Sequence, residues 1–296
     1  MTVKNYILGT DWWTDCDDAV ALRIAARAHK AGEICLRGVG INACMACSAA
    51  SLEGFLNLEG VEDVPVGIDL EATDFGGNPP YQKRLAPFAQ RYHANAYAED
   101  AVRLYRRLLA GSDEPVEIIE IGFLQVMAAV LESPPDDISD KPGTELVREK
   151  VPKIWVMAGK WDEDAGREHN FARNQRAIAG AKTFCEKCPV PVTFLGWEVG
   201  ASVISGGTLR QDDHLRMALK DFGAESGRSS WDPMLMVLAL TGDEHAAGYD
   251  VVQGHASVDA ETGANHFRQD ENGLHRYVVK RMSDGFYRDQ INSLIQ

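Results

Sequence analysis

The stretch TDWWTDCDDAVAL, residues 10–22, places four aspartates within eight positions, directly ahead of an apolar run. The preceding segment NYILGT is typical of a short buried strand, and DDAVAL begins a helical pattern that ends at Gly32. Aspartates at a helix start cap free backbone N–H groups, which explains one or two of the four. The others repel one another unless a cation lies between them. The stretch therefore predicts a strand, a helix and a divalent cation held by carboxylate oxygens where the two meet.

Strand-like and helix-like segments alternate outward from this stretch. The strand-like segments are residues 5–10, 34–42, 64–68, 116–122, 153–159 and 190–196, and the helix-like ones are residues 17–32, 48–60, 98–112 and 123–133. This alternation predicts an α/β fold with a doubly wound, mostly parallel sheet flanked by helices, in which ligands bind beyond the carboxyl ends of the strands. After Gly242 the helical periodicity ends, and residues 249–282 predict a small C-terminal β-hairpin appendage. We expect residues 1–296 to form a single domain.

The composition and net charge argue against some classes of binding partner. Of the 296 residues, 45% are hydrophobic, enough for a sizeable core, and the formal net charge of −14 argues against binding to a nucleic-acid backbone. No uncharged apolar run is long enough for a membrane span, and the N-terminus lacks the apolar region of a signal peptide. We therefore expect a cytoplasmic protein with a small-molecule substrate and no nucleic-acid or membrane partner.

Two CxxC pairs occur, at Cys44 and Cys47 and at Cys185 and Cys188. They are too far apart in sequence for a zinc ribbon, and a cytoplasmic setting favours reduced thiols. A zinc site assembled from distant loops is the alternative. For the aspartates, the spacing of an EF-hand is absent. A haloacid-dehalogenase-like phosphatase pattern would lack the Thr or Val that follows its two aspartates.

The aspartate-rich stretch resembles the opening of the nucleoside hydrolases, whose fingerprint is a strand followed by DTDPGxDDAxAL. The counterpart here is GTDWWTDCDDAVAL, residues 9–22. With a two-residue insertion, Asp11 takes the place of the second aspartate of the fingerprint, which acts as the base. Without a gap, Trp13 takes that place. We prefer the insertion because it keeps a carboxylate in the catalytic position.

Further motifs of the family have counterparts in the same order along the chain. An asparagine ends the second strand, VGINA, and IGFLQV resembles the family's strand followed by GPLTN. REHNF resembles its EFN motif, and SSWDPM resembles its HD motif at the start of a late helix. The matching residues are Asn42, Gln125, Glu168, Asn170 and Asp232. Each alone is ordinary in a turn or a helix cap, but together they indicate the fold and its metal site.

The resemblance implies a Ca²⁺-dependent enzyme that cleaves the N-glycosidic bond of a ribonucleoside or a related ribosyl compound, and that forms a homodimer or homotetramer. The implied metal ligands are Asp11, Asp18, Asp232 and the main-chain carbonyl of Gln125. Asp11 is also the implied general base, and the implied ribose contacts are Asp17, Asn42, Glu168 and Asn170. Asp15 has no counterpart in the fingerprint and is the alternative base.

The sequence departs from the family where the leaving base is recognised. The family's His-Asp pair is Trp231-Asp232 here, so a histidine that protonates a purine leaving group is missing at this position. The candidates for contacting the base are Trp12, Trp13, Tyr81, Trp161, Glu198 and Trp231. The residues implied to bind the ribose match the family, whereas those implied to bind the base differ from it. A non-catalytic, metal-dependent binder of nucleosides or sugars is therefore the alternative function.

Overall fold

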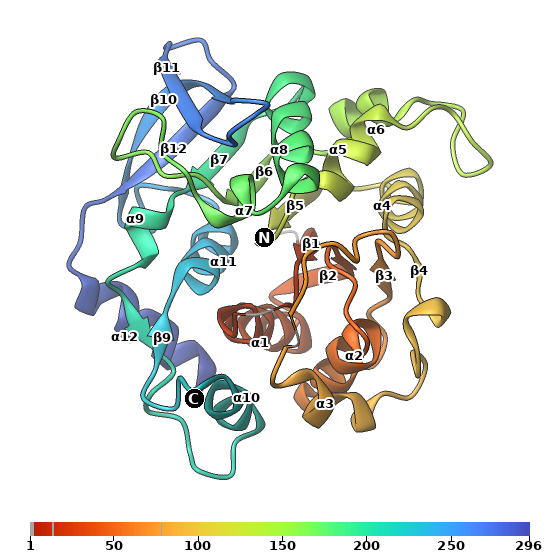
Figure 1. The fold of residues 1–296 in the computed structure, drawn as a ribbon, viewed down its shortest axis with the longest axis vertical. Coiled ribbons are helices and arrows are strands. Elements are labelled where there is room, and N and C mark those ends of the chain that lie inside the picture. The colour runs from red at the N-terminus through yellow and green to blue at the C-terminus, as the bar shows by residue number, and fades with distance from the viewer. Residues whose placement is uncertain (1–2, 14, 78) are drawn as a thin grey trace.

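Ten strands form one sheet in the computed structural model, which describes residues 3–13, 15–77 and 79–296 (Figure 1). Their order is β11-β10-β12-β7-β6-β5-β1-β2-β3-β4, and all neighbours from β12 to β4 are parallel. The strands are β1 (Lys4–Thr10), β2 (Ile34–Ile41), β3 (Val66–Ile68), β4 (Glu99–Asp100), β5 (Val116–Glu120), β6 (Ile154–Met157), β7 (Val192–Leu195), β10 (Tyr249–Val258), β11 (Asn265–Gln269) and β12 (His275–Lys280). A separate antiparallel pair joins β8 (Ile204–Ser205) to β9 (Arg228–Ser229).

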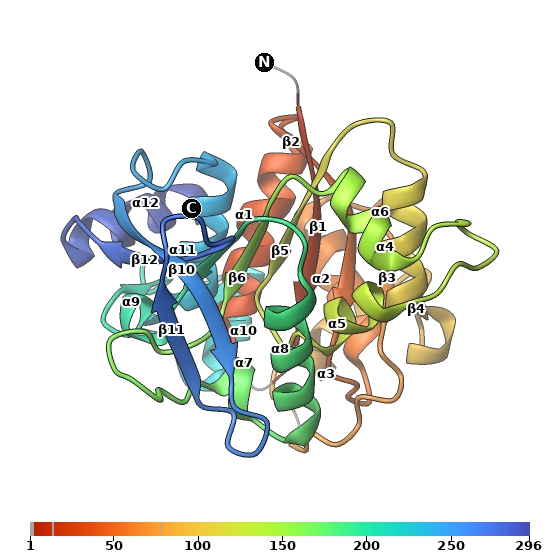
Figure 2. The ribbon, with the colours of Figure 1, turned by 90° about the horizontal axis from the view of Figure 1, so that it is seen from above.

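Helices cover both faces of the sheet (Figure 2). They are α1 (Asp17–Lys30), α2 (Ser48–Glu59), α3 (Gln82–Leu85), α4 (Ala101–Ala110), α5 (Gln125–Glu132), α6 (Gly143–Lys150), α7 (His169–Ala172), α8 (Gln175–Lys187), α9 (Trp197–Gly200), α10 (His214–Phe222), α11 (Trp231–Thr241) and α12 (Asp284–Ile295), with short 3₁₀ turns at Ala86–Phe88 and Asn95–Tyr97. None of these helices in the described ranges is long and apolar enough to cross a lipid bilayer.

The two faces of the sheet carry two separate cores, as the alternation of strand side chains requires. Leu8 of β1 packs in a core with α1, α2 and α11, whereas its neighbour Ile7 packs in a core with α4, α5 and α8. Both side chains are fully buried. The predicted α/β fold with a mostly parallel sheet is therefore confirmed.

The C-terminal hairpin is present and extends the main sheet. β10 pairs antiparallel with both β11 and β12, and β12 pairs parallel with β7, which attaches the hairpin to the sheet edge. The expectation that helical structure ends at Gly242 is wrong, because the chain finishes in α12. The signal was in the sequence: Tyr287, Ile291 and Ile295 recur every fourth residue and are the buried residues of that helix.

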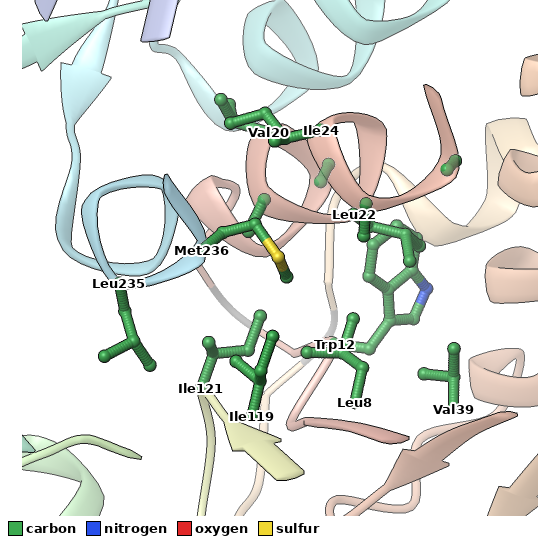
Figure 3. Close-up of a cluster of buried hydrophobic side chains, with 14 of the residues drawn as sticks. Leu8, Trp12, Val20, Leu22, Ile24, Val39, Ile119, Ile121, Leu235 and Met236 are labelled. Carbon is green, nitrogen blue, oxygen red and sulfur yellow. The ribbon is translucent and has the colours of Figure 1, made fainter. Parts of the chain in front are cut away.

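Trp12 belongs to the core beneath the end of β1. Figure 3 shows its ring among Leu8, Leu22 and Val39, between α1 and the sheet. The side chain is fully buried, and its indole N–H donates to the Ser51 hydroxyl at 2.8 Å. This corrects the prediction that Trp12 contacts a base, because the ring packs in the core and its N–H is hydrogen-bonded to Ser51.

The cysteines are free thiols. Cys185 and Cys188 are buried in the core formed with α4, α5 and α8, and burial raises the pKa of both thiols. Within the described ranges, the one group of three potential metal ligands consists of aspartates and includes no cysteine. The structure thus gives the alternative of a zinc site from distant loops no support.

Glu120, at the end of β5, is a buried carboxyl with an incomplete set of partners. It is 0% exposed, and one oxygen accepts a hydrogen bond from the Tyr105 hydroxyl at 3.0 Å. Its other oxygen, Oε2, has no partner among the described residues. A Cβ on Gly9 would lie 1.8 Å from Oε2, so only glycine fits beside it. Burial raises the pKa of Glu120 from 4.5 to about 8.

We expect Glu120→Gln to stabilise the protein more at pH 9 than at pH 5. Because the folded-state pKa is raised, the unfolded state ionises first as the pH climbs, and the free energy of unfolding falls until the pH passes about 8. Glutamine removes that loss, which is on the order of 5 kcal/mol for a pKa raised from 4.5 to about 8, at about 1.4 kcal/mol per pKa unit. Urea unfolding of both proteins at the two pH values measures it. The exposed Glu145→Gln is the control, and an equal effect of Glu120→Gln at both pH values would contradict the prediction.

Candidate active site

A cavity of about 250 Å³ opens at the carboxyl ends of the central strands β1, β5 and β6. This is the edge at which ligands bind in parallel sheets, and the volume suits a compact small molecule. The lining residues are Asp11, Asp15, Asp17, Asp18, Ile121, Met157, Glu168, His169, Asn170, Trp197, Arg228, Trp231 and Asp232. They come from β6, β9, α1, α7, α9, α11 and the loops that follow β1, β5 and β6.

Three carboxylates meet on one side of the cavity. Asp17 and Asp18 begin α1, Asp232 lies in the first turn of α11, and one oxygen of each lies within 4.8 Å of the others. All three side chains are buried. Burial, and then the mutual repulsion of the carboxylates, raises the pKa of each aspartate well above its usual range. A cation between them would relieve both costs, and an all-oxygen donor set suits a hard divalent ion such as Ca²⁺ or Mg²⁺.

Asp11 lies beside this group, directly after β1. Burial raises its pKa to about 8, opposed by the Trp13 N–H, which donates to its carboxylate at 3.1 Å. The charges of Asp17, Asp15 and Glu168 also raise it. The predicted ligand set named Asp11, whereas the three-carboxylate group contains Asp17 in its place. Asp11 is therefore a fourth carboxylate next to the group.

The backbone between β1 and α1 is strained where it shapes the site. Trp12 has φ 45°, in the left-handed region that a bulky residue rarely adopts. Hydrogen bonds hold it there, because the Trp12 N–H donates to the Thr10 hydroxyl at 3.0 Å, and that hydroxyl donates to the Asp18 carboxylate. The strained turn thus connects the end of the strand to one of the clustered carboxylates.

Glu168 and Asn170 form a second polar group of the cavity, at the start of α7. The Glu168 carboxylate caps the helix by accepting from the Asn170 N–H at 2.8 Å, and it also accepts from the Gly159 N–H at 3.0 Å. Burial raises the pKa of Glu168 to about 7, opposed by these hydrogen bonds. The Asn170 amide donates to the Met157 carbonyl at 2.9 Å, which fixes it to the end of β6. Both line the cavity, and their contact with a ribose stays a prediction.

Asp15 also lines the cavity, but it is paired with a cation that sequence reasoning missed. Arg228 of β9 donates to its carboxylate twice, at 2.9 and 2.6 Å. The same guanidinium lies 5.3 Å from the centre of the Trp231 ring. The two hydrogen bonds engage both oxygens of the Asp15 carboxylate.

Two tryptophans form the aromatic side of the cavity. The Trp231 indole N–H donates to the Trp197 carbonyl at 2.7 Å, and the two rings lie 6.4 Å apart at 30°. Trp197 is 43% exposed, so its ring is available to a ligand. Trp231 was predicted here. Trp197 was missed, although it directly precedes the predicted Glu198.

Asn42 and Gln125 are two predicted residues that lie outside the cavity. Asn42 is buried, and its side-chain oxygen accepts from the Phe123 N–H at 3.0 Å. Gln125 begins α5, and its amide donates to the Asn42 carbonyl. Gln125 is not among the residues that line the cavity, and metal binding by its main-chain carbonyl stays a prediction. Both residues support the loop after β5 and do not line the site.

Trp161 and Glu198 lie in a different hollow, against β12. The chain turns away from the cavity at Gly159, where φ is 85°. The Trp161 ring then stacks on Tyr277 at 5.7 Å and 10°, and its backbone N–H donates to the Glu198 carboxylate at 3.2 Å. Their predicted contact with a base is therefore corrected.

Comparisons with known proteins identify the fold. No model of a protein family matches the sequence, and no curated protein matches it. Among solved structures, the chain is similar to the inosine-uridine preferring nucleoside hydrolase from Bacillus anthracis, with a TM-score of 0.68 and 14% identity over 99% of both chains. It is also similar to the purine-preferring ribonucleoside hydrolase from Gardnerella vaginalis, with a TM-score of 0.66 and 16% identity over 99% of both chains.

A third similar structure is the type III effector protein XopQ complexed with adenosine diphosphate ribose. Its TM-score is 0.70 at 16% identity, over 100% of this chain and 94% of that one. The chain therefore has the nucleoside hydrolase fold, as its motifs predicted. Because a fold does not by itself fix an activity, the function has to be argued from the cavity.

Proposed function

We propose that the protein is a Ca²⁺-dependent hydrolase that cleaves the N-glycosidic bond of a ribonucleoside, or of a related ribosyl compound, to the free base and ribose. The observation that carries the proposal is the buried group of Asp17, Asp18 and Asp232, with Asp11 beside it, in a cavity at the carboxyl ends of the strands. Burying a charged side chain without a partner is costly, so a protein that binds nothing at this place would not keep four aspartates together out of water.

The chemistry of the bond suits such a cavity. As the bond between C1′ and the base nitrogen breaks, positive charge develops on the ribose ring. Carboxylates that are already fixed near the ring stabilise this charge better than water does. Asp17, Asp18 and Asp232 would hold the cation, and a bound Ca²⁺ supplies fixed positive charge that orients ribose hydroxyls and makes a water more acidic.

Asp11 accepts the proton of the attacking water in this proposal. It is the acidic residue closest in sequence to the end of β1, and its carboxylate has no salt-bridge partner among the described residues, in contrast to the paired Asp15. Glu168 and Asn170 hold hydroxyl groups of the ribose from α7. Trp197 and Trp231 contact the base.

Two features favour the alternative of a non-catalytic binder of nucleosides or sugars. Trp231 stands at the position where the resembling family has a histidine, and its N–H is occupied by the Trp197 carbonyl. Incubating the calcium-loaded protein with purine and pyrimidine ribonucleosides, followed by chromatography, separates the two functions. The proposal expects free base from at least one nucleoside. Protection against heat by a nucleoside that stays intact would favour the binder.

We also propose a cytoplasmic homodimer or homotetramer, which rests on the resemblance alone. Light scattering of the purified protein is expected to give a mass at least twice that of the 32.5 kDa chain. A strict monomer at micromolar concentration would contradict this part of the proposal.

A further inference from the structure

His169 lines the cavity but belongs to none of the motifs that the sequence singled out. It is the first residue of α7, directly after Glu168. Its ring stacks on that of Trp13, with the ring centres 5.5 Å apart at 19°, and lies 5.6 Å from that of Phe123. The imidazole is therefore held flat against an aromatic surface at the edge of the cavity.

That aromatic surface is itself fixed. Trp13 is buried, its indole N–H donates to the Gly76 carbonyl at 2.6 Å, and its own carbonyl accepts from the Tyr81 hydroxyl at 2.9 Å. The Arg173 guanidinium lies 4.7 Å from the centre of the Trp13 ring. Because Trp13 is anchored at both ends, the plane of the His169 ring is set before a ligand arrives.

No residue of the described ranges hydrogen-bonds to the His169 ring, so its nitrogens are available to a ligand. Three other nitrogen donors of the cavity, on Asn170, Arg228 and Trp231, are already engaged. Arg228 is paired with Asp15 and holds its protons too tightly to give one up, and the Trp231 N–H is bound to a carbonyl. Burial and the nearby Arg173 charge lower the pKa of His169, opposed by Asp15. The protonated ring is therefore a stronger acid than a free imidazolium.

We propose that His169 is the acid that protonates the leaving base, an inference that rests on the proposed function. The C1′–N bond breaks and its electron pair stays on the base. The imidazolium N–H proton moves to a nitrogen of the base, which leaves as a neutral molecule. Water oxygen forms the new bond to C1′, and the proton that this water loses goes to Asp11. The neutral imidazole regains a proton from solvent and Asp11 returns one, so the net reaction consumes one water.

His169→Phe tests this role, because phenylalanine keeps a ring on Trp13 and removes both nitrogens. Two substrates are compared: a nucleoside that the wild type cleaves, and p-nitrophenyl riboside, whose leaving group departs as a stable anion and needs no acid. We expect kcat to fall roughly 10²–10⁴-fold for the nucleoside, the usual range for losing a general acid, and to stay close to wild type for the p-nitrophenyl riboside.

The controls separate the possible failures. His93→Phe, in an exposed loop, should leave both rates unchanged, and His169→Gln should repeat the selective loss if the phenylalanine variant folds poorly. Equal loss on both substrates, or no loss on the nucleoside, would overturn the role of His169 while leaving the proposed function standing. So would a wild type that cleaves only the p-nitrophenyl riboside. A wild type that cleaves neither substrate would instead refute the proposed function.

Discussion

Asp11→Asn should lower kcat for nucleoside cleavage by roughly 10²–10⁴-fold, the usual cost of removing a general base, while the fold stays intact. An amide is nearly isosteric with the carboxylate, and its oxygen still accepts from the Trp13 N–H. It cannot, however, take a proton from water. Steady-state kinetics gives the loss of kcat, and circular dichroism checks that the variant is folded.

Asp15→Asn is the matched control and should be milder, because Asp15 is already neutralised by Arg228. If Asp15→Asn abolishes turnover and Asp11→Asn is nearly harmless, the base is Asp15 and the two-residue insertion is misplaced. A second readout is stability without metal. Burial raises the pKa of Asp11 to about 8, so its ionised form is penalised as the pH rises toward that value. Asp11→Asn should therefore raise the melting temperature of the metal-free protein more at pH 8 than at pH 5.

Removing the metal should abolish turnover entirely and lower the melting temperature. Without a cation, the clustered Asp17, Asp18 and Asp232 repel one another in a buried place and must take up protons. Restoring calcium should stabilise the fold by about 2.7 kcal/mol at a hundredfold excess over Kd. Calcium should stabilise more than magnesium, because Mg²⁺ demands strict octahedral geometry and gives up its waters reluctantly.

Asp232→Asn makes this prediction specific to the site. It should weaken the calcium-dependent shift in melting temperature, whereas the exposed Glu145→Gln should leave that shift unchanged. An undiminished rate in the presence of excess chelator would contradict the role of the metal. So would an equal calcium shift in the wild type and in Asp232→Asn.

The parts of the site that lie close together in sequence could be predicted. Asp11, Asp17 and Asp18 follow from one strand, one turn and one helix start, whose geometry is local. Glu168 and Asp232 were found because each sits at a helix start within a motif that has a counterpart in the resembling family. The sheet followed from the alternation of apolar segments, which needs no long-range information.

The rest depends on contacts that the sequence does not display. Trp12 and Trp13 are adjacent and chemically identical, yet their rings lie in different places. With a left-handed backbone at Trp12, the Trp12 ring packs in the core beneath α1, whereas the Trp13 ring stacks on His169. Arg228 comes from a two-residue strand without a pattern of its own. Its partner Asp15 lies 213 residues away. Such pairings are set by how loops from different strands meet above the sheet.

The most direct test of calcium-dependent nucleoside cleavage is to measure the free ribose released from a nucleoside. The measurement is made with calcium, after calcium is removed, and after it is restored. We expect ribose and base in equal amounts with calcium, neither after chelation, and both again when calcium is returned. Nucleosides that protect the calcium-loaded protein against heat, yet yield no ribose from any member of a purine and pyrimidine panel, would contradict the claim and make the cavity a binding site.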